Sequence, residues 1–160
     1  MEIKRSLILA LGSNLGNREE LINQAYELIE TYIGTIKLKS AFYENEAVGF
    51  ESKVLFINSC IEVETNLAPL EILKFSQRIE KDLGRVEKLN SRAYESRKID
   101  IDIILLDTLV YSSEILTIPH KLYRNRLFVL APLSEIAKHR IDPITQLTIN
   151  QIVEINKANS

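Results

Sequence analysis

The sequence predicts a single α+β domain in which helices cover one mostly antiparallel sheet. Three observations predict this class. Residues 7–11 form an uninterrupted apolar run, two later segments carry apolar residues at helical spacing, and other segments alternate apolar with polar residues. The chain has 160 residues, the usual size of one domain, and no repeat or Pro/Gly/Ser-rich linker divides it. We therefore expect residues 1–160 to share one core.

Composition narrows the class of protein further. Hydrophobic residues make up 46% and charged residues 26% of the chain, which is typical of globular proteins. The formal net charge of −2 argues against a general binder of nucleic acid or membrane surfaces. Cys60 is the single cysteine, which excludes an intrachain disulfide and a cysteine-based zinc site. The apolar run after Arg5 is too short for a signal peptide. We expect a monomeric, cytoplasmic protein.

The first half of the chain predicts two strands joined by a helix. Residues 7–11 are expected to form a central strand, followed by a turn-rich loop over residues 12–17. Apolar residues recur at helical spacing over residues 21–32, and Gly34 closes that helix. Alternation over residues 36–42 predicts a second, half-exposed strand.

The middle of the chain predicts a third strand, a second helix and a long loop. Residues 44–52 are expected to form a loop, and residues 54–65 alternate as a strand does. Pro69 suits the first turn of a helix whose apolar stripe ends at Gly84. Residues 86–98 have few apolar side chains and no clear period, which predicts a long mobile loop.

The last part of the chain predicts a further strand and then extra elements. Residues 99–106 are expected to form a strand, residues 115–118 a short one, and residues 130–137 a helix. Thr148 suits the N-cap of a final helix. The resulting order β-α-β-β-α-β is that of a ferredoxin-like α/β sandwich, here with extra C-terminal elements.

Two aspartates in one strand are the first candidates for chemistry. Asp100 and Asp102 share a strand face, roughly 6–7 Å apart, while Ile99, Ile101 and Ile103 face the opposite way. Two adjacent carboxylates repel each other unless cations lie between them, and Mg²⁺ commonly takes one or two carboxylates plus substrate phosphates. The alternative is a solvated face of an amphipathic strand. A metal site is one reading of the pair and surface charge the other.

Basic residues gather on both sides of this strand. Residues 78–98 contain seven Lys and Arg against four acids, and residues 120–126 contain His120, Lys121, Arg124 and Arg126 with no acid among them. Such patches could bind a polyphosphate, because guanidinium groups bind phosphate in a bidentate way. They could equally be solvated loops with screened ion pairs, and His120 alone is more often a surface residue than a catalyst. The loop over residues 12–17 is neither a P-loop nor G-x-G-x-x-G.

Aromatic residues and one amide could form a stacking pocket for a flat ligand. Phe56, Tyr94 and Phe128 would supply the rings and Asn58 the amide. Core packing is the alternative for each aromatic residue taken singly.

Five blocks, in order from about residue 6 to 137, resemble the 6-hydroxymethyl-7,8-dihydropterin pyrophosphokinase family. The Arg-x-x-Asp-x-Asp block and the Pro-His pair are its specific part. The blocks are Ala10-Leu11-Gly12-Ser13-Asn14-Leu15-Gly16, Phe56-Ile57-Asn58, Gln77-Arg78-Ile79-Glu80 before Gly84-Arg85, Arg97-x-Ile99-Asp100-Ile101-Asp102, and Pro119-His120 before Asn125-Arg126-x-Phe128-Val129-Leu130-x-Pro132-Leu133.

The resemblance implies an enzyme of folate biosynthesis that transfers the diphosphate of ATP to the hydroxymethyl group of the pterin and releases AMP. It implies two Mg²⁺ ions held by Asp100 and Asp102, and ATP as co-substrate. The catalytic residues it implies are Arg85, Arg97, Asp100 and Asp102. Those near the nucleotide are Gln77, Glu80, Arg85, Arg97, His120 and Arg126. Those near the pterin are Asn45, Val48, Phe56, Asn58, Tyr94 and Phe128.

The chain departs from the family pattern at several positions. Glu95-Ser96 stands where Gly-Pro is usual, Tyr94 where tryptophan is usual, Asn45-Glu46 where Thr-Pro is usual, and Glu87 where arginine is frequent. These departures concern loop closure and nucleotide affinity more than the chemistry. The alternatives are a non-catalytic ligand-binding module on the same fold, and a metal-dependent phosphohydrolase that needs no pterin.

Overall fold

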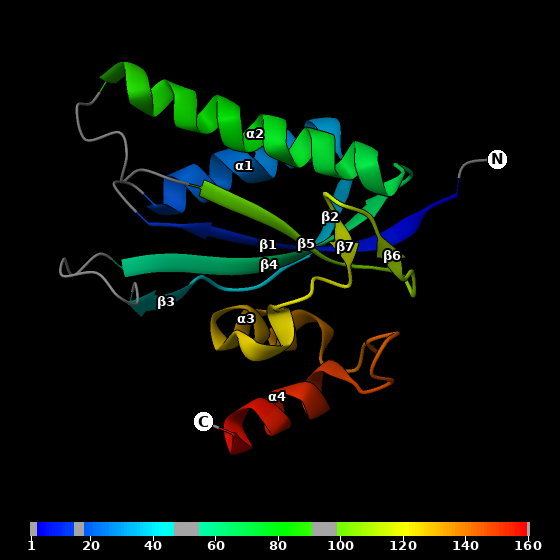
Figure 1. The fold of residues 1–160 in the computed structure, drawn as a ribbon. Coiled ribbons are helices and arrows are strands. Elements are labelled where there is room, and N and C mark those ends of the chain that lie inside the picture. Colours follow the sequence, from blue (N-terminus) through cyan, green and yellow to red (C-terminus); the bar gives the residue numbers. More distant parts are fainter. Residues whose placement is uncertain (1–2, 15–17, 47–54, 91–98, 160) are drawn as a thin grey trace.

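A five-stranded antiparallel sheet lies between two layers of helices (Figure 1). The structure, a computed structural model, describes residues 3–14, 18–46, 55–90 and 99–159. Helices α1 (Arg18–Tyr32) and α2 (Pro69–Asn90) cover one face of the sheet, and α3 (Leu127–Ala137) and α4 (Ile149–Ala158) lie below the other face (Figure 1). The predicted α+β class is confirmed.

The sheet has the strand order that defines a ferredoxin-like fold. Its central strands are β1 (Arg5–Ser13) and β4 (Leu55–Thr65), flanked by β2 (Thr35–Lys39) and β5 (Ile99–Leu106) in the order β2-β4-β1-β5. A short strand β3 (Tyr43–Glu46) also pairs with β4. All of these pairings are antiparallel, as predicted.

The apolar run in β1 reflects burial on both faces. Leu7, Leu9 and Leu11 belong to the core beneath α1 and α2, whereas Ile8 and Ala10 belong to the core shared with α3 and α4. Successive side chains of a strand point to opposite faces, so a strand covered on both sides is apolar at every position. The extra C-terminal helices therefore complete the second core.

Several predicted boundaries are confirmed and others are wrong. Residues 99–106 form β5 as predicted, and Thr148 caps α4 in a reciprocal capping box with Gln151. A short hairpin of β6 (Tyr111–Ser112) and β7 (Thr117–Ile118) contains part of the expected strand 115–118 and adds β6, which was not predicted. Helix α3 begins at Leu127, three residues before its predicted start at residue 130.

The strand predicted over residues 36–42 ends early, because β2 stops at Lys39. A separate strand, β3, covers Tyr43–Glu46, so the loop prediction is wrong for residues 44–46, and residues 47–52 lie outside the described residues. Between them the Ser40 hydroxyl accepts a bond from the Cys60 amide, and the Ala41 amide donates to the Glu135 carboxylate at 3.1 Å. The Ser40 amide still donates to the Cys60 carbonyl at 2.9 Å, so at this break side-chain acceptors supplement the backbone pairing with β4.

Helix α2 passes through Gly84 and ends at Asn90. The prediction that Gly84 ends this helix is wrong, and so is the loop prediction for residues 86–90; residues 91–98 lie outside the described residues. Glycine in a helix interior costs only about 1 kcal/mol relative to alanine, which the rest of a long helix offsets.

Alanine substitution should have opposite effects on stability at Gly34 and at Gly84. A Cβ on Gly34 would lie 2.1 Å from the Glu64 carbonyl oxygen, whereas one on Gly84 would meet no described atom within 4 Å. Gly34→Ala should lower the free energy of unfolding by about 2–3 kcal/mol, and Gly84→Ala should raise it by up to about 1 kcal/mol. Urea unfolding of both variants checks this. Equal effects of the two substitutions would contradict it.

Candidate active site

Asn58 on β4 and the aspartate pair on β5 lie on either side of Gly12 in the sheet. In the ladder Gly12 lies opposite Asn58 on one side and opposite Asp100 on the other. Ala10, two residues earlier in β1, lies opposite Cys60 and Asp102 in the same way. Residues that face each other across antiparallel strands project from the same face, so Asn58 and both aspartates point to the side of α3.

A pocket of about 410 Å³ opens on this face of the sheet. Its volume is within the range of small-molecule sites. It brings together seven of the residues predicted from the sequence, and its remaining lining includes the small residues Ala10 and Gly12. The seven are Asn45, Phe56, Asn58, Asp100, Asp102, Arg126 and Phe128.

Gly12 has no side chain and so leaves space at the base of this pocket. A Cβ at this position would lie 3.0 Å from the Asn58 side-chain oxygen. Asn58 is buried, and its amide nitrogen donates to the side-chain oxygen of Asn45 from β3. The hydrogen bond therefore ties β3 to β4 within the pocket and fixes the amide of Asn58.

The two aspartates have the arrangement predicted from strand periodicity. Asp100 and Asp102 are half-buried, and Ile99, Ile101 and Ile103 are buried on the opposite face. Among the described residues, no group of three or more His, Cys, Asp or Glu could by itself hold a metal ion. A pair of carboxylate oxygens fits Mg²⁺, which completes its shell with water and substrate phosphate.

His120 lies beside the open edge of β5. Its backbone amide donates to the Ile104 carbonyl at 3.0 Å, and the Leu122 amide donates to its Nδ1 at 3.1 Å. Because Nδ1 accepts a hydrogen bond, the proton of the neutral ring is on Nε2. Burial lowers the pKa of His120, the charge of Asp102 opposes that effect, and the nearby charge of Arg126 adds to it. The neutral, Nε2-protonated ring is therefore favoured near pH 7.

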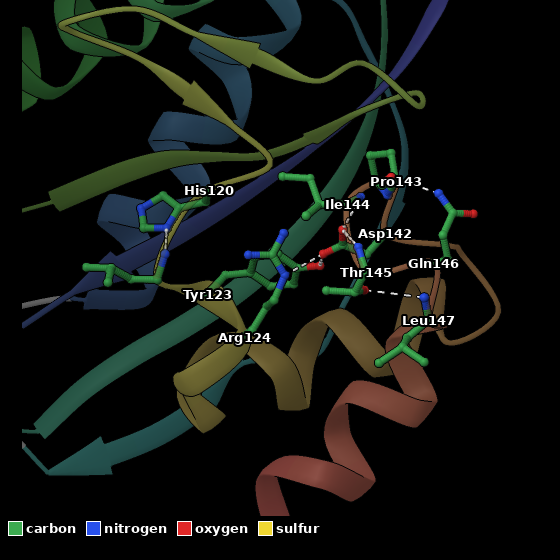
Figure 2. A network of polar contacts seen from close by, with 10 residues as sticks. His120, Tyr123, Arg124, Asp142, Pro143, Ile144, Thr145, Gln146 and Leu147 are labelled. Carbon is green, nitrogen blue, oxygen red and sulfur yellow. Dashed lines mark hydrogen bonds and ion pairs between the residues drawn. The ribbon is translucent and has the colours of Figure 1, made fainter.

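Arg124, from the basic cluster at residues 120–126, has an acidic partner that is distant in sequence. Figure 2 shows Asp142, from the segment between α3 and α4, beside Tyr123 and Arg124. The fully buried Asp142 carboxylate accepts from Arg124 Nε at 2.7 Å and from the Tyr123 hydroxyl at 2.5 Å, while the Ile144 and Thr145 amides donate to its other oxygen. Arg124 therefore differs from Arg126, which lines the pocket with its guanidinium 5.7 Å from the ring of Phe128.

The remaining predicted residues are distributed as follows. Gln77 is exposed on α2 and does not line the pocket, and Glu80, also on α2, accepts a hydrogen bond from the Ile101 amide at 2.7 Å. Arg85 belongs to α2. Three residues lie outside the described part of the chain: Val48, Tyr94 and Arg97.

Sequence reasoning missed the role of Gly12 and the partner of Arg124. Gly12 was predicted to begin a loop and was part of a family motif, whereas β1 continues through it to Ser13 and nothing local shows that it lies opposite Asn58 and Asp100. In the described part of the chain, no helix combines the length and apolar character that a membrane crossing requires.

The fold and pocket define an α+β protein with a small-molecule site that combines carboxylates, an arginine, aromatic rings and an amide. The profile of the 7,8-dihydro-6-hydroxymethylpterin-pyrophosphokinase (HPPK) family matches residues 8–138. Two relatives named 2-amino-4-hydroxy-6-hydroxymethyldihydropteridine pyrophosphokinase are similar over 81% of this chain. The Porphyromonas gingivalis protein is 44% identical with 88% of its length covered, and the Bacillus subtilis protein is 39% identical with 77% of its length covered. The chain belongs to the HPPK family, and it is a diphosphokinase.

Longer proteins contain the same kind of domain. The folic acid synthesis protein of Dictyostelium discoideum is 38% identical over 90% of this chain, which spans 21% of that protein. A Plasmodium falciparum HPPK-DHPS crystal structure with pteroate has a TM-score of 0.76 at 15% identity, covering 99% of this chain and 44% of the other. At that identity the match concerns the fold, and this chain spans less than half of the solved chain. The predicted monomeric state and cytoplasmic location stay predictions.

Asp142→Asn should destabilise the protein strongly. The substitution keeps the shape of the side chain but leaves the Arg124 guanidinium without its charged partner in a half-buried position. Losing one partner of a buried pair costs about 3 kcal/mol. Urea unfolding measures the loss, and Tyr123→Phe, which removes one hydrogen bond to the same carboxylate, should cost about 1 kcal/mol. A smaller loss for Asp142→Asn than for Tyr123→Phe would contradict the assignment.

The ion pair of Arg124 and Asp142 also predicts that the stability of the protein depends on pH. Burial by itself would raise the pKa of Asp142, but hydrogen bonds from Arg124, Tyr123 and two backbone amides outweigh it and lower the pKa. Asp142 therefore contributes stability in full above its unfolded pKa of about 3.9 and loses it as the pH falls through the folded value. The stability difference between wild type and Asp142→Asn should be constant above about pH 5 and shrink below about pH 4. A constant difference down to pH 2 would contradict this.

Proposed function

We propose that the pocket over Gly12 is the centre at which this enzyme transfers the diphosphate of ATP to the hydroxymethyl group of 6-hydroxymethyl-7,8-dihydropterin. The observation that carries the proposal is the meeting of Asn58, Asp100 and Asp102 on one sheet face around a glycine, in a chain of the HPPK family. The hydroxymethyl oxygen attacks the β-phosphorus of ATP, the bond from that phosphorus to the oxygen shared with the α-phosphorus breaks, and AMP leaves. The hydroxyl proton passes to water.

The pterin end of the pocket is formed by β3, β4 and α3. Asn58 is buried and its amide is fixed by Asn45, which suits in-plane hydrogen bonds to a nitrogen-rich ring. Phe56 and Phe128 line the same pocket and offer flat apolar contacts to the ring. Val48 and Tyr94 complete this end in the proposal, on the basis of the family resemblance.

The phosphate end is formed by β5 and the segment that follows β7. Two Mg²⁺ ions held by Asp100 and Asp102 would neutralise the triphosphate and lower the pKa of the attacking hydroxyl group. Arg126 lines the pocket and would bind phosphate oxygens, and the Nε2–H of neutral His120 is a donor suited to the same role. Gln77, Arg85 and Arg97 are assigned to the nucleotide from the family resemblance. Phosphoryl transfer depends mostly on such positioning and charge neutralisation.

Release of AMP with and without the pterin tests the activity. The pyrophosphokinase should release AMP only when ATP, Mg²⁺ and hydroxymethyl-dihydropterin are all present, and should form one pterin diphosphate for each AMP. AMP or phosphate released at the same rate without pterin would instead indicate a phosphohydrolase.

Asp100→Asn and Asp102→Asn should each abolish nearly all transfer while the protein stays folded. The amide keeps the shape of the side chain but not its charge, so the loss is expected on the order of 10³-fold in rate or more. AMP release at saturating Mg²⁺ measures it, and circular dichroism checks the fold. Asp82→Asn, at a partly exposed position on α2 where the carboxylate pairs with Arg78, is the matched control and should be fully active. Retention of more than a tenth of the wild-type rate in either site variant would overturn the metal assignment.

Asn58→Ala should weaken pterin binding and leave ATP binding almost unchanged. Loss of a buried hydrogen-bonding amide costs about 1–3 kcal/mol, or roughly 5- to 150-fold in Kd. Calorimetric titration with each ligand separates the two effects. Asn150→Ala, on the exposed side of α4, should change neither affinity. Equal weakening of pterin and ATP binding by Asn58→Ala would show that the pterin assignment is wrong.

A further inference from the structure

We propose that Glu80 is a positioning residue: it holds the strand that carries Asp100 and Asp102 and does not bind the nucleotide itself. This inference rests on the proposed function, in which the two aspartates hold the metal. The observation behind it is one hydrogen bond, in which the Ile101 amide, between the two aspartates, donates to Glu80 Oε2 at 2.7 Å. The family resemblance alone would place Glu80 beside the nucleotide.

Strand β5 needs such a partner because it lies at the edge of the sheet. It pairs with β1 on one side, and in the described part of the chain no strand pairs with it on the other. The outward N–H and C=O groups of an edge strand are unpaired unless side chains or loops bond to them. Here the Ile101 amide is bonded by Glu80, and the Ile104 carbonyl accepts from the His120 amide at 3.0 Å. One of these contacts comes from α2 and the other from the segment that follows β7.

The hydrogen bond to Glu80 acts on the backbone between the two aspartates. The Ile101 amide nitrogen is joined directly to the carbonyl carbon of Asp100, and Asp102 is the next residue after Ile101. The Ile101 side chain is buried beneath α1 and α2 together with Ile79, the neighbour of Glu80. One face of the strand is thus held by packing and its edge by Glu80. Rotation of β5 about its own axis, which would swing both carboxylates, is opposed from two directions.

Glutamine and alanine separate positioning from direct binding. In Glu80→Gln the side-chain oxygen can still accept from the Ile101 amide, although the charge is lost. In Glu80→Ala the acceptor is gone. A positioning role predicts that Gln restores most of what Ala removes. Glu71→Ala is the matched control, because Glu71 also belongs to α2 and its carboxylate also accepts from a backbone amide, that of Ala68 at 2.9 Å.

Three measurements on the 160-residue chain separate positioning from nucleotide binding. Hydrogen exchange followed by NMR reports whether the Ile101 amide is bonded. Titration with Mn²⁺ followed by electron paramagnetic resonance, without substrates, reports the affinity of the aspartate pair for a divalent cation. Steady-state kinetics give kcat and the KM values for ATP and pterin.

We expect Glu80→Ala to speed exchange at Ile101 and to lower both Mn²⁺ affinity and kcat by about 10- to 100-fold, the usual effect of losing a residue that orients a metal ligand. The KM for ATP should change by less than about threefold, because positioning acts on the transition state more than on binding. Glu80→Gln should stay within about threefold of wild type in all three measurements, and Glu71→Ala should match wild type.

Two results would overturn the inference. One is free exchange of the Ile101 amide in the wild-type protein. The other is an equal loss of ATP affinity in the Gln and Ala variants while Ile101 stays protected, which would make Glu80 a nucleotide contact. If Glu80→Ala does not fold, Glu80→Asp replaces it, because the shorter side chain keeps the charge but withdraws the acceptor. Absence of pterin-dependent AMP release in the wild type would refute the proposed function alone, since the exchange and Mn²⁺ measurements need no turnover.

Discussion

The pairing of β1 with β4 on one side and β5 on the other is the constraint on which the site depends. This register places Asn58 and Asp100 opposite the same glycine. It holds because β1 is buried on both faces, and a shift by one residue would turn its apolar side chains to the wrong cores and its neighbours' polar groups away from the pocket. Core packing of β1 therefore sets which residues of β4 and β5 share the pocket face.

The C-terminal helices form the opposite wall, and buried polar contacts hold them in place. Asp142 fixes Tyr123 and Arg124 within the segment that leads from His120 to Arg126 (Figure 2). Arg140 extends this attachment to the sheet, donating to the hydroxyl and the carbonyl oxygen of Ser6 at 2.6 and 2.7 Å. Apolar packing tolerates small shifts, whereas a buried ion pair with several hydrogen bonds has one favourable geometry. Such contacts are suited to fixing the segment of His120 and Arg126 relative to the aspartates.

Sequence reasoning succeeded where the controlling interactions are local. The period of two in residues 99–106 predicted both the strand and the shared face of Asp100 and Asp102. Thr148, a residue type favoured at the N-cap, correctly predicted the start of α4. It failed where residues distant in sequence determine the end of a helix or the partner of a side chain. Gly84 ended the predicted helix because propensity is local, yet α2 continues beyond it. The cluster around Arg124 had no acid in its own segment, and Asp142 is 18 residues away. The order of the family motifs indicated which residues belong together, but the register that joins them is a property of the folded sheet.

Under the proposed function, the register also determines how the two substrates are arranged across the sheet. Asn58 on β4 and Asp100 on β5 are separated by β1, which places their backbones about 10 Å apart at the usual strand spacing. Under the proposed function, the pterin lies towards β4 and the phosphates towards β5, so the hydroxymethyl group lies over β1. The residue of β1 at that point is Gly12, where a side chain would crowd the Asn58 amide. A glycine there leaves the space between the two substrates open, so the attacking oxygen and the β-phosphorus can approach each other without an intervening side chain.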